Sequence, residues 1–292
     1  MSFDADTFKA FERAGWNQRA AGYRAVSWNS TRLGLDPVLD AAGVTAGMDV
    51  LDVATGPGYG AALAVARGAR AIGVDFAAAM LEEARQTFPE VEFREGDAEA
   101  LPFGDCRFDA VTCSFGMLHF ARPERAIAES FRVLRPGGRY AFSAWCAAER
   151  VAHFGMFRCA IAAHGDPHAG GIPPGPDMFR FADPRECLQV LEAAGFRETT
   201  VKEIAIRRRV APEALVKGLR HATVRSRALL DAQTPEARAA IEAALLEEAR
   251  TLAGPDGILD LTLPAVLASG ARGQRPGYAG GYTLRRYRRP SI

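Results

Sequence analysis

The chain has 292 residues, of which 48% are hydrophobic, and its formal net charge is +1. This length suffices for one α/β core with an elaboration, and the near-neutral charge excludes the strongly basic balance typical of nucleic-acid-binding proteins. The five cysteines form no C-x-x-C pair, so neither a disulfide framework nor a cysteine zinc site is predicted. We expect a cytoplasmic protein, because the sequence shows no signal-peptide pattern and no apolar run of about 18 residues.

Residues 5–40 are predicted to be helical and are rich in aromatic side chains. Phe8, Phe11, Trp16, Tyr23 and Trp28 precede the first predicted strand. Such a segment either packs on the domain or covers a ligand, and the sequence leaves both open. We take residues 1–44 as an N-terminal helical cap, with Trp16, Tyr23 and Trp28 as candidate substrate-pocket residues.

From residue 48 to residue 145 the pattern alternates between apolar strands and helices. The predicted strands are 49–54, 70–75, 91–95, 109–114 and 138–145. The predicted helices are 59–67, 77–87 and 123–134, with a short turn near 117–120. Because such alternation is typical of a parallel, doubly wound sheet with helices on both faces, we expect an α/β fold whose cofactor-binding core spans 45–146.

A glycine-rich turn follows the first of these strands. Gly56, Gly58 and Gly60 remove side chains where a nucleotide lies against the main chain, and Asp75 ends the next strand, where a ribose needs an acceptor. Dinucleotides and S-adenosylmethionine both use this arrangement. The dinucleotide fingerprint G-x-G-x-x-G is not met, because position 61 holds alanine, but alanine is tolerated there and a nicotinamide-dependent oxidoreductase stays an alternative.

The pattern changes after residue 145. Residues 146–164 are predicted to be helical and are followed by a loop rich in glycine and proline. We interpret residues 147–182 as an inserted substrate lid, with His153 and Phe157 as candidate pocket residues. His164 and His168 have the spacing of a helical metal pair, but Gly165 disfavours a helix there, so no metal is expected.

Residues 183–271 are expected to complete the sheet. A helix is predicted at 183–194, a strand at 199–210, helices at 212–231 and 235–253, and a final apolar segment at 259–269. The remaining residues, 272–292, form a basic tail that includes Tyr278, Tyr282 and Arg285. The tail suits phosphate contacts, but the nearly neutral chain favours a flexible or subunit-embracing terminus.

Five motifs carry a resemblance to a known family. They are D-V-A-T-G-P-G at 52–58, V-D at 74–75, E-G-D-A-E-A-L-P-F at 95–103, F-D at 108–109 and L-R-P-G-G at 134–138. In this order they resemble class I S-adenosylmethionine-dependent methyltransferases, above all the branch of the ubiquinone and menaquinone C-methyltransferases and many small-molecule enzymes. A weaker similarity to the same family covers F-R-F-A-D-P at 179–184 and A-G-F at 194–196. The resemblance implies a seven-stranded, mostly parallel sheet with an antiparallel last strand.

The same resemblance implies where S-adenosylmethionine binds. Asp52, Ala54 and Gly56 would meet its methionine part, with Gly58 in the same turn, and Asp75 would hold both ribose hydroxyls. Phe76 and Met80 would flank the adenine, while Asp97 and the amide of Ala98 would meet its polar edge. Ser114 and Phe115 would lie near the transferable methyl. Each residue also has a purely structural alternative, such as helix capping or core packing.

Methyl transfer from a sulfonium is an in-line displacement, so the enzyme mainly aligns and desolvates the reactants. A base is needed only where the acceptor loses a proton. His119 is the candidate, although a helix-start or packing role is the slightly favoured interpretation. A cofactor-binding protein without methyl transfer remains an alternative. The expected partner is a small organic acceptor, without nucleic acid or membrane; the oligomeric state, a homodimer included, stays open.

Overall fold

The structure is organised around a seven-stranded sheet. The computed structural model describes residues 3–26, 28–220 and 223–274, except for the side chains at 21, 23–26, 28 and 29. The strand order is β3-β2-β1-β4-β5-β7-β6. The strands are β1 (Asp49–Val53), β2 (Arg70–Asp75), β3 (Glu92–Glu95), β4 (Phe108–Ser114), β5 (Leu134–Trp145), β6 (Phe196–Val210) and β7 (Leu259–Arg272).

The pairing confirms the predicted topology. β1, β2, β3, β4 and β5 are parallel neighbours, whereas β7 runs antiparallel to both β5 and β6. Val50, Leu51 and Val53 of β1 are at most 1% exposed, which explains why these positions of the central strand are apolar. Leu134 pairs with Phe108 ahead of a register shift, so β5 begins four residues earlier than the predicted strand at 138.

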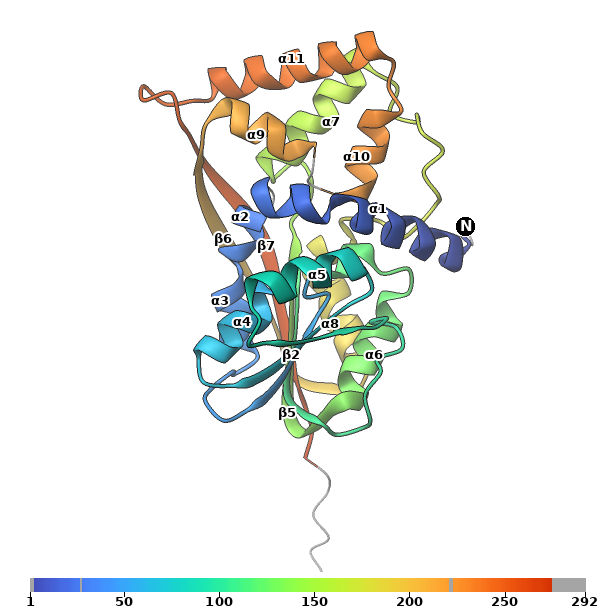
Figure 1. Cartoon of the computed structure of the whole chain (residues 1–292), viewed down its shortest axis with the longest axis vertical. Coiled ribbons are helices and arrows are strands. Elements are labelled where there is room, and N and C mark those ends of the chain that lie inside the picture. Colours follow the sequence, from blue (N-terminus) through green and yellow to red (C-terminus); the bar gives the residue numbers. More distant parts are fainter. Residues whose placement is uncertain (1–2, 27, 221–222, 275–292) are drawn as a thin grey trace, which may run out of the picture.

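Helices cover the sheet on both faces (Figure 1). Those of the core are α3 (Leu35–Ala41), α4 (Tyr59–Ala66), α5 (Ala78–Thr87), α6 (Pro123–Val133) and α8 (Pro184–Ala193). Their starts follow ordinary helix chemistry: α6 and α8 carry proline in the first turn, and the Asp183 side chain accepts a hydrogen bond from the Arg185 amide at 2.9 Å. The short helix η1 (Met117–His119) follows β4, and η2 (Arg180–Ala182) precedes α8.

A second group of helices lies beyond one end of the sheet. It comprises α7 (Ala152–His164), α9 (Pro212–Leu219), α10 (Val224–Asp231) and α11 (Pro235–Thr251). The helix α1 (Ala5–Val26) runs between this group and the sheet, and α2 (Trp28–Arg32) follows it (Figure 1). From here on, the helical cap means α1, α2 and the four helices of the second group. It differs from the predicted N-terminal cap at 1–44, because it excludes α3 and includes the second group.

The strand β6 begins at Phe196, three residues before the predicted strand at 199. The structure also corrects three predicted helical segments. The single helical segment at 5–40 forms three helices, since Leu33 and Gly34 make a turn before α3. The predicted helix at 212–231 is divided into α9 and α10. The predicted helix at 146–164 begins only at Ala152, because Ala147 to Val151 form turns, in which the Ala147 carbonyl accepts from the Arg150 amide at 2.9 Å. No helix in the part of the chain that the structure describes has the length and apolar character needed to cross a membrane.

Candidate functional site

A pocket lies at the carboxyl ends of the parallel strands, where ligands bind in open α/β sheets. Its lining includes most of the residues that the sequence singled out. They are Trp16, Asp52, Ala54, Gly56, Asp75, Phe76, Met80, Asp97, Ala98, Ser114, Phe115 and His119. The structure thus brings residues from β1, β2, β4 and α1, and from the loop after β3, to one place.

The glycine-rich turn has the geometry that its composition predicts. Gly58 has φ +87°, and a Cβ atom built there would lie 2.6 Å from the Phe93 ring. A Cβ atom on Gly60 would lie 2.5 Å from Oδ2 of Asp52. Gly56 has φ +53° and open space where its Cβ would be, so its main chain can be approached closely. Gly56 and Gly60 line the pocket, while Gly58 precedes α4 beneath it.

Asp52, at the end of β1, is a buried carboxylate with neutral partners. The Thr55 hydroxyl donates to its Oδ2 at 2.7 Å, and the Thr112 hydroxyl donates to its Oδ1 at 2.8 Å. Burial nevertheless dominates and raises the pKa of Asp52 to about 6. The carboxylate therefore ties the glycine-rich turn to β4 at a cost in desolvation.

Asp75, at the end of β2, is also buried. Its Oδ2 accepts a hydrogen bond from the Gly56 amide and its Oδ1 accepts one from the Ala77 amide, both at 2.9 Å. Burial raises the pKa of Asp75, while these two amides oppose the increase. Each carboxylate oxygen keeps acceptor capacity toward the pocket, because an ionised carboxylate offers about four lone-pair sites.

Two neighbouring strands end in strained main chain. Ala54 after β1 has φ +53° and Phe115 after β4 has φ +56°, a region that side-chain-bearing residues seldom occupy. Beside Phe115, the Ser114 hydroxyl is buried and has no hydrogen-bond partner among the described residues. Strain and an unpaired hydroxyl on one pocket wall both mark a place prepared for a ligand.

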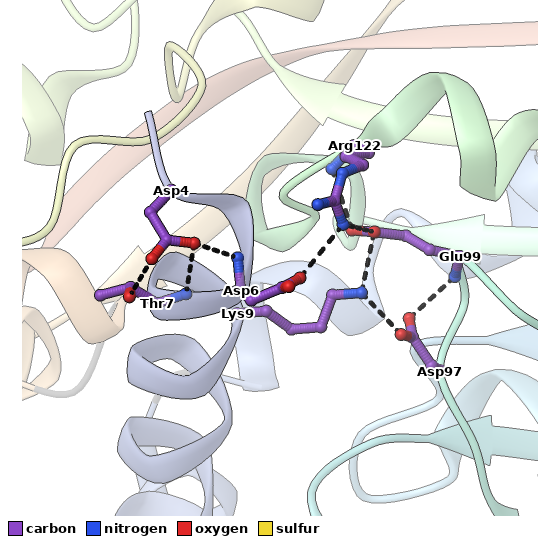
Figure 2. Close-up of polar contacts among 7 residues, drawn as sticks. All are labelled: Asp4, Asp6, Thr7, Lys9, Asp97, Glu99 and Arg122. Atoms are coloured by element: carbon purple, nitrogen blue, oxygen red, sulfur yellow. Dashed lines mark hydrogen bonds and ion pairs between the residues drawn. The ribbon is translucent and has the colours of Figure 1, made fainter. Parts of the chain in front are cut away.

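Helix α1 is tied to the pocket by ion pairs (Figure 2). Lys9 Nζ lies 2.6 Å from Oδ2 of Asp97 and 2.8 Å from Oε2 of Glu99. The Arg122 guanidinium lies 3.3 Å from Asp6 and 3.5 Å from Glu99, and its amide donates to Glu99 at 2.9 Å. Asp97, predicted to accept from adenine, therefore already meets a cation from the cap.

A second link joins α1 to His119. Glu12 has no exposed surface, and its Oε2 lies 2.9 Å from Nδ1 of His119. Its Oε1 lies 3.3 Å from Nε of Arg225, on α10. The Trp16 ring meets the His119 ring edge to face, with centroids 4.9 Å apart. Glu12 and Arg225 were missed by sequence reasoning; the available signal was that Glu12 lies on the apolar stripe formed by Phe8 and Trp16, at i, i+4 and i+8.

Known proteins match this architecture. A family model described as "Methyltransferase domain" matches residues 51–142. A demethylmenaquinone methyltransferase from Deinococcus radiodurans is 36% identical over 163 residues, which are 51% of this chain and 67% of the relative. The chain belongs to the class I S-adenosylmethionine-dependent methyltransferases.

Other relatives share less of their length with the chain. The demethylmenaquinone methyltransferase of Renibacterium salmoninarum is 41% identical over 114 residues, 39% of this chain and 48% of the relative. The chain thus spans about half the length of the first curated relatives that it matches. Among solved structures, the YcgJ protein of Bacillus subtilis has a TM-score of 0.54 at 24% identity, covering 83% of this chain and 99% of that one, which shows the shared fold.

The remaining predicted substrate-pocket residues do not line one common cavity. Phe157 lines a second, mostly apolar cavity of about 740 Å³ between α7, the loop at 165–179 and α10. His153 is buried against Trp145 and Phe154 and is not among the residues lining either cavity. The side chains of Tyr23 and Trp28 lie outside the described residues, as does the tail from residue 275 onward.

Proposed function

We propose that the protein transfers a methyl group from S-adenosylmethionine to a small organic acceptor. The observation that carries this proposal is the buried Asp75 carboxylate, which is fixed by two main-chain amides at the edge of a pocket that also contains the glycine-rich turn. A buried carboxylate with neutral partners is costly unless a polar ligand meets it. The family membership supports the same interpretation.

The pocket residues fit the cofactor that the family uses. Asp75 would hold the ribose hydroxyls, Phe76 and Met80 would flank the adenine, and Asp97 and the Ala98 amide would meet its polar edge. Asp52, Ala54, Gly56 and Gly58 would shape the methionine end, with Ser114 and Phe115 beside the methyl group. When bound, the cofactor supplies a methyl group made labile by the positive charge on sulfur.

The protein's own contribution is mainly alignment and exclusion of water. Holding two reactants in a near-attack geometry accounts for about 7–11 kcal/mol of a barrier. Helix α1 covers the pocket through Lys9 and Trp16, which suits such an enclosed site. His119 lines the same pocket and is the proposed base for acceptors that lose a proton.

The acceptor is proposed to be an apolar or aromatic molecule. The second cavity is lined by Phe154, Phe157, Ile161, Met178 and Leu229 among others, and its size falls within the range of small-molecule sites. The relatives' names point to a quinone, so reduced demethylmenaquinone is the first acceptor to test. The quinol is chosen over the quinone because a nucleophile is needed to attack the electrophilic methyl. All five cysteines are unpaired, which supports the proposed cytoplasmic location.

The first experiment is calorimetric titration of the purified protein with S-adenosylhomocysteine, and with NADH in parallel. We expect micromolar or tighter binding of the thioether alone. Binding of NADH alone would contradict the proposal and favour a nicotinamide-dependent oxidoreductase. Cofactor binding with no methylated product across a broad acceptor panel, reduced demethylmenaquinone included, would instead identify a binding protein.

A further inference from the structure

The buried Glu12 makes specific charged contacts that the packing of α1 alone does not require. Its position on the apolar stripe of α1 would ordinarily hold a hydrophobic residue, because removing a carboxylate from water is costly. The structure compensates the charge from two other elements, with His119 from η1 and Arg225 from α10. Arg225 is itself held by the carbonyl oxygens of Leu118 and Pro176. Three separate elements therefore meet at one carboxylate.

This contact determines which nitrogen of His119 carries a proton in the neutral ring. A carboxylate accepts hydrogen bonds only, so Nδ1, at 2.9 Å from Glu12, must be the donor. Nε2 is then left with a free lone pair. Glu12 from α1 contacts the ring, and Arg225 from α10 contacts Glu12. The other charged and titratable side chains that line the pocket together with His119 are Lys9, Arg32, Asp52, Tyr59, Asp75, Asp97 and Glu99.

We propose that Glu12 is a positioning residue that holds His119 with Nε2 free to accept a proton in the methyl-transfer pocket. This inference rests on the proposed function and deepens it. The acceptor class becomes a molecule that loses a proton when methylated, such as one with a hydroxyl group or an activated carbon acid. Arg225 acts through Glu12, since it orients the carboxylate from the side opposite to His119.

The step balances without a further reactant. The acceptor's nucleophilic atom forms a bond to the methyl carbon as the carbon–sulfur bond breaks, and the electron pair of that bond remains on sulfur, which becomes a neutral thioether. The proton leaves the acceptor for Nε2 of His119. The resulting imidazolium is stabilised by the Glu12 carboxylate, in the manner of a base oriented by a buried acid, and later loses its proton to water.

The test is nitrogen-15 NMR of the histidine rings in the whole protein, at a pH where the rings are neutral. The His119 signals are assigned by their loss in His119→Asn. We expect Nδ1 to be protonated and Nε2 to be bare in the wild type. In Glu12→Gln, which loses the charge at similar shape, the preference for this tautomer falls about tenfold or more. Arg13→Gln, which removes another α1 ion pair with Glu95, leaves it unchanged.

Two results would overturn the inference: a wild-type ring protonated mainly on Nε2, or the same tautomer ratio in the wild type and Glu12→Gln. If Glu12→Gln does not fold because Arg225 is left buried, the double variant Glu12→Gln/Arg225→Met removes both charges and answers the same question. The tautomer is read without cofactor, so it is separate from the proposed function. That function fails if S-adenosylhomocysteine does not bind the wild type, whatever the tautomer.

Discussion

Two buried carboxylates, Asp52 in the sheet and Glu12 in the helical cap, are stabilised in different ways. Asp52 is held by two hydroxyl groups, one of them only three residues away. Glu12 meets the His119 ring and the Arg225 guanidinium, which are more than 100 residues away along the chain. The sheet therefore gives its carboxylate only neutral partners and carries an uncompensated desolvation cost, whereas the cap pairs its carboxylate with a histidine ring and a guanidinium.

The largest expected effect concerns a buried base in the cap. Burial lowers the pKa of His153 to about 3, from 6.5. Below pH 6.5, His153 binds a proton in the unfolded chain but stays neutral in the folded protein. The free energy of unfolding therefore decreases as the pH falls toward 3. The loss reaches about 3 kcal/mol between pH 7 and 4 at 1.36 kcal/mol per unit. His153→Leu removes this loss, measured by urea unfolding at both pH values.

The exposed His168 provides the control, since His168→Leu keeps the wild-type pH dependence. Parallel pH profiles for the wild type and His153→Leu would mean that His153 is charged or hydrated in the fold. The cap would then compensate this buried group as it compensates Glu12, which would extend the contrast with the sheet.

The next effect tests the desolvation cost of Asp52. Its pKa is raised from 3.8 to about 6, so its contribution to stability is fully favourable below pH 3.8 and is lost as the pH rises through 6. Asp52→Asn abolishes this titration. The stability of Asp52→Asn relative to wild type is expected to rise by about 3 kcal/mol between pH 3.8 and 7, at 1.36 kcal/mol per unit.

Comparing the change with pH cancels the constant cost of altered hydrogen bonds to Thr55 and Thr112. Asp260→Asn, at an exposed position, is the control and leaves the pH profile unchanged. A stability difference that stays flat with pH would show that Asp52 is ionised at no cost, and would break the contrast with Glu12.

The next prediction concerns ligand affinity and a second buried carboxylate of the sheet, Asp75. Asp75→Ala removes the proposed acceptor for two ribose hydroxyls, and hydrogen bonds to charged groups contribute about 1.5–3 kcal/mol each. We expect the affinity for S-adenosylhomocysteine to fall about 100-fold, measured by calorimetry on a variant whose thermal unfolding remains cooperative. Glu95→Gln, at the end of the next strand, is the control. Unchanged affinity in Asp75→Ala would place the ribose elsewhere.

Features that depend on local sequence could be predicted, whereas contacts between distant segments could not. The strands from β1 to β4 and the residues of the glycine-rich turn were predicted almost to the residue, because burial pattern and backbone conformation are local properties. Asp52 and Asp75 were found because they end such strands. The partners of Glu12 could not be found in this way, since η1 and α10 reach it only after the chain has folded.

The cap also shows where local patterns mislead. The stripe of Phe8, Glu12 and Trp16 contains a charge. The charge alone would assign Glu12 to solvent, whereas its helical spacing assigns it to the buried face, and Glu12 is fully buried. Phe157 and Trp16, both predicted as substrate-pocket residues, line two different cavities. The Arg225 partner of Glu12 and the separation of the two cavities become visible only in the tertiary arrangement of α7 and α10.

The smallest expected effect comes from the partly exposed contacts of α1. Lys9 is 23% exposed and pairs with Asp97 and Glu99, and such a pair is screened by water and salt. Lys9→Met is expected to cost about 0.5–1 kcal/mol of stability at low salt and less at high salt, measured by urea unfolding in both. Arg94→Met, which removes a pair within the exposed edge strand β3, serves as the comparison. A larger, salt-independent loss in Lys9→Met would mean that the cap is fastened to the sheet mainly through Glu99, whose carboxylate is only 3% exposed, and that this contact belongs with Glu12 among the compensated buried charges.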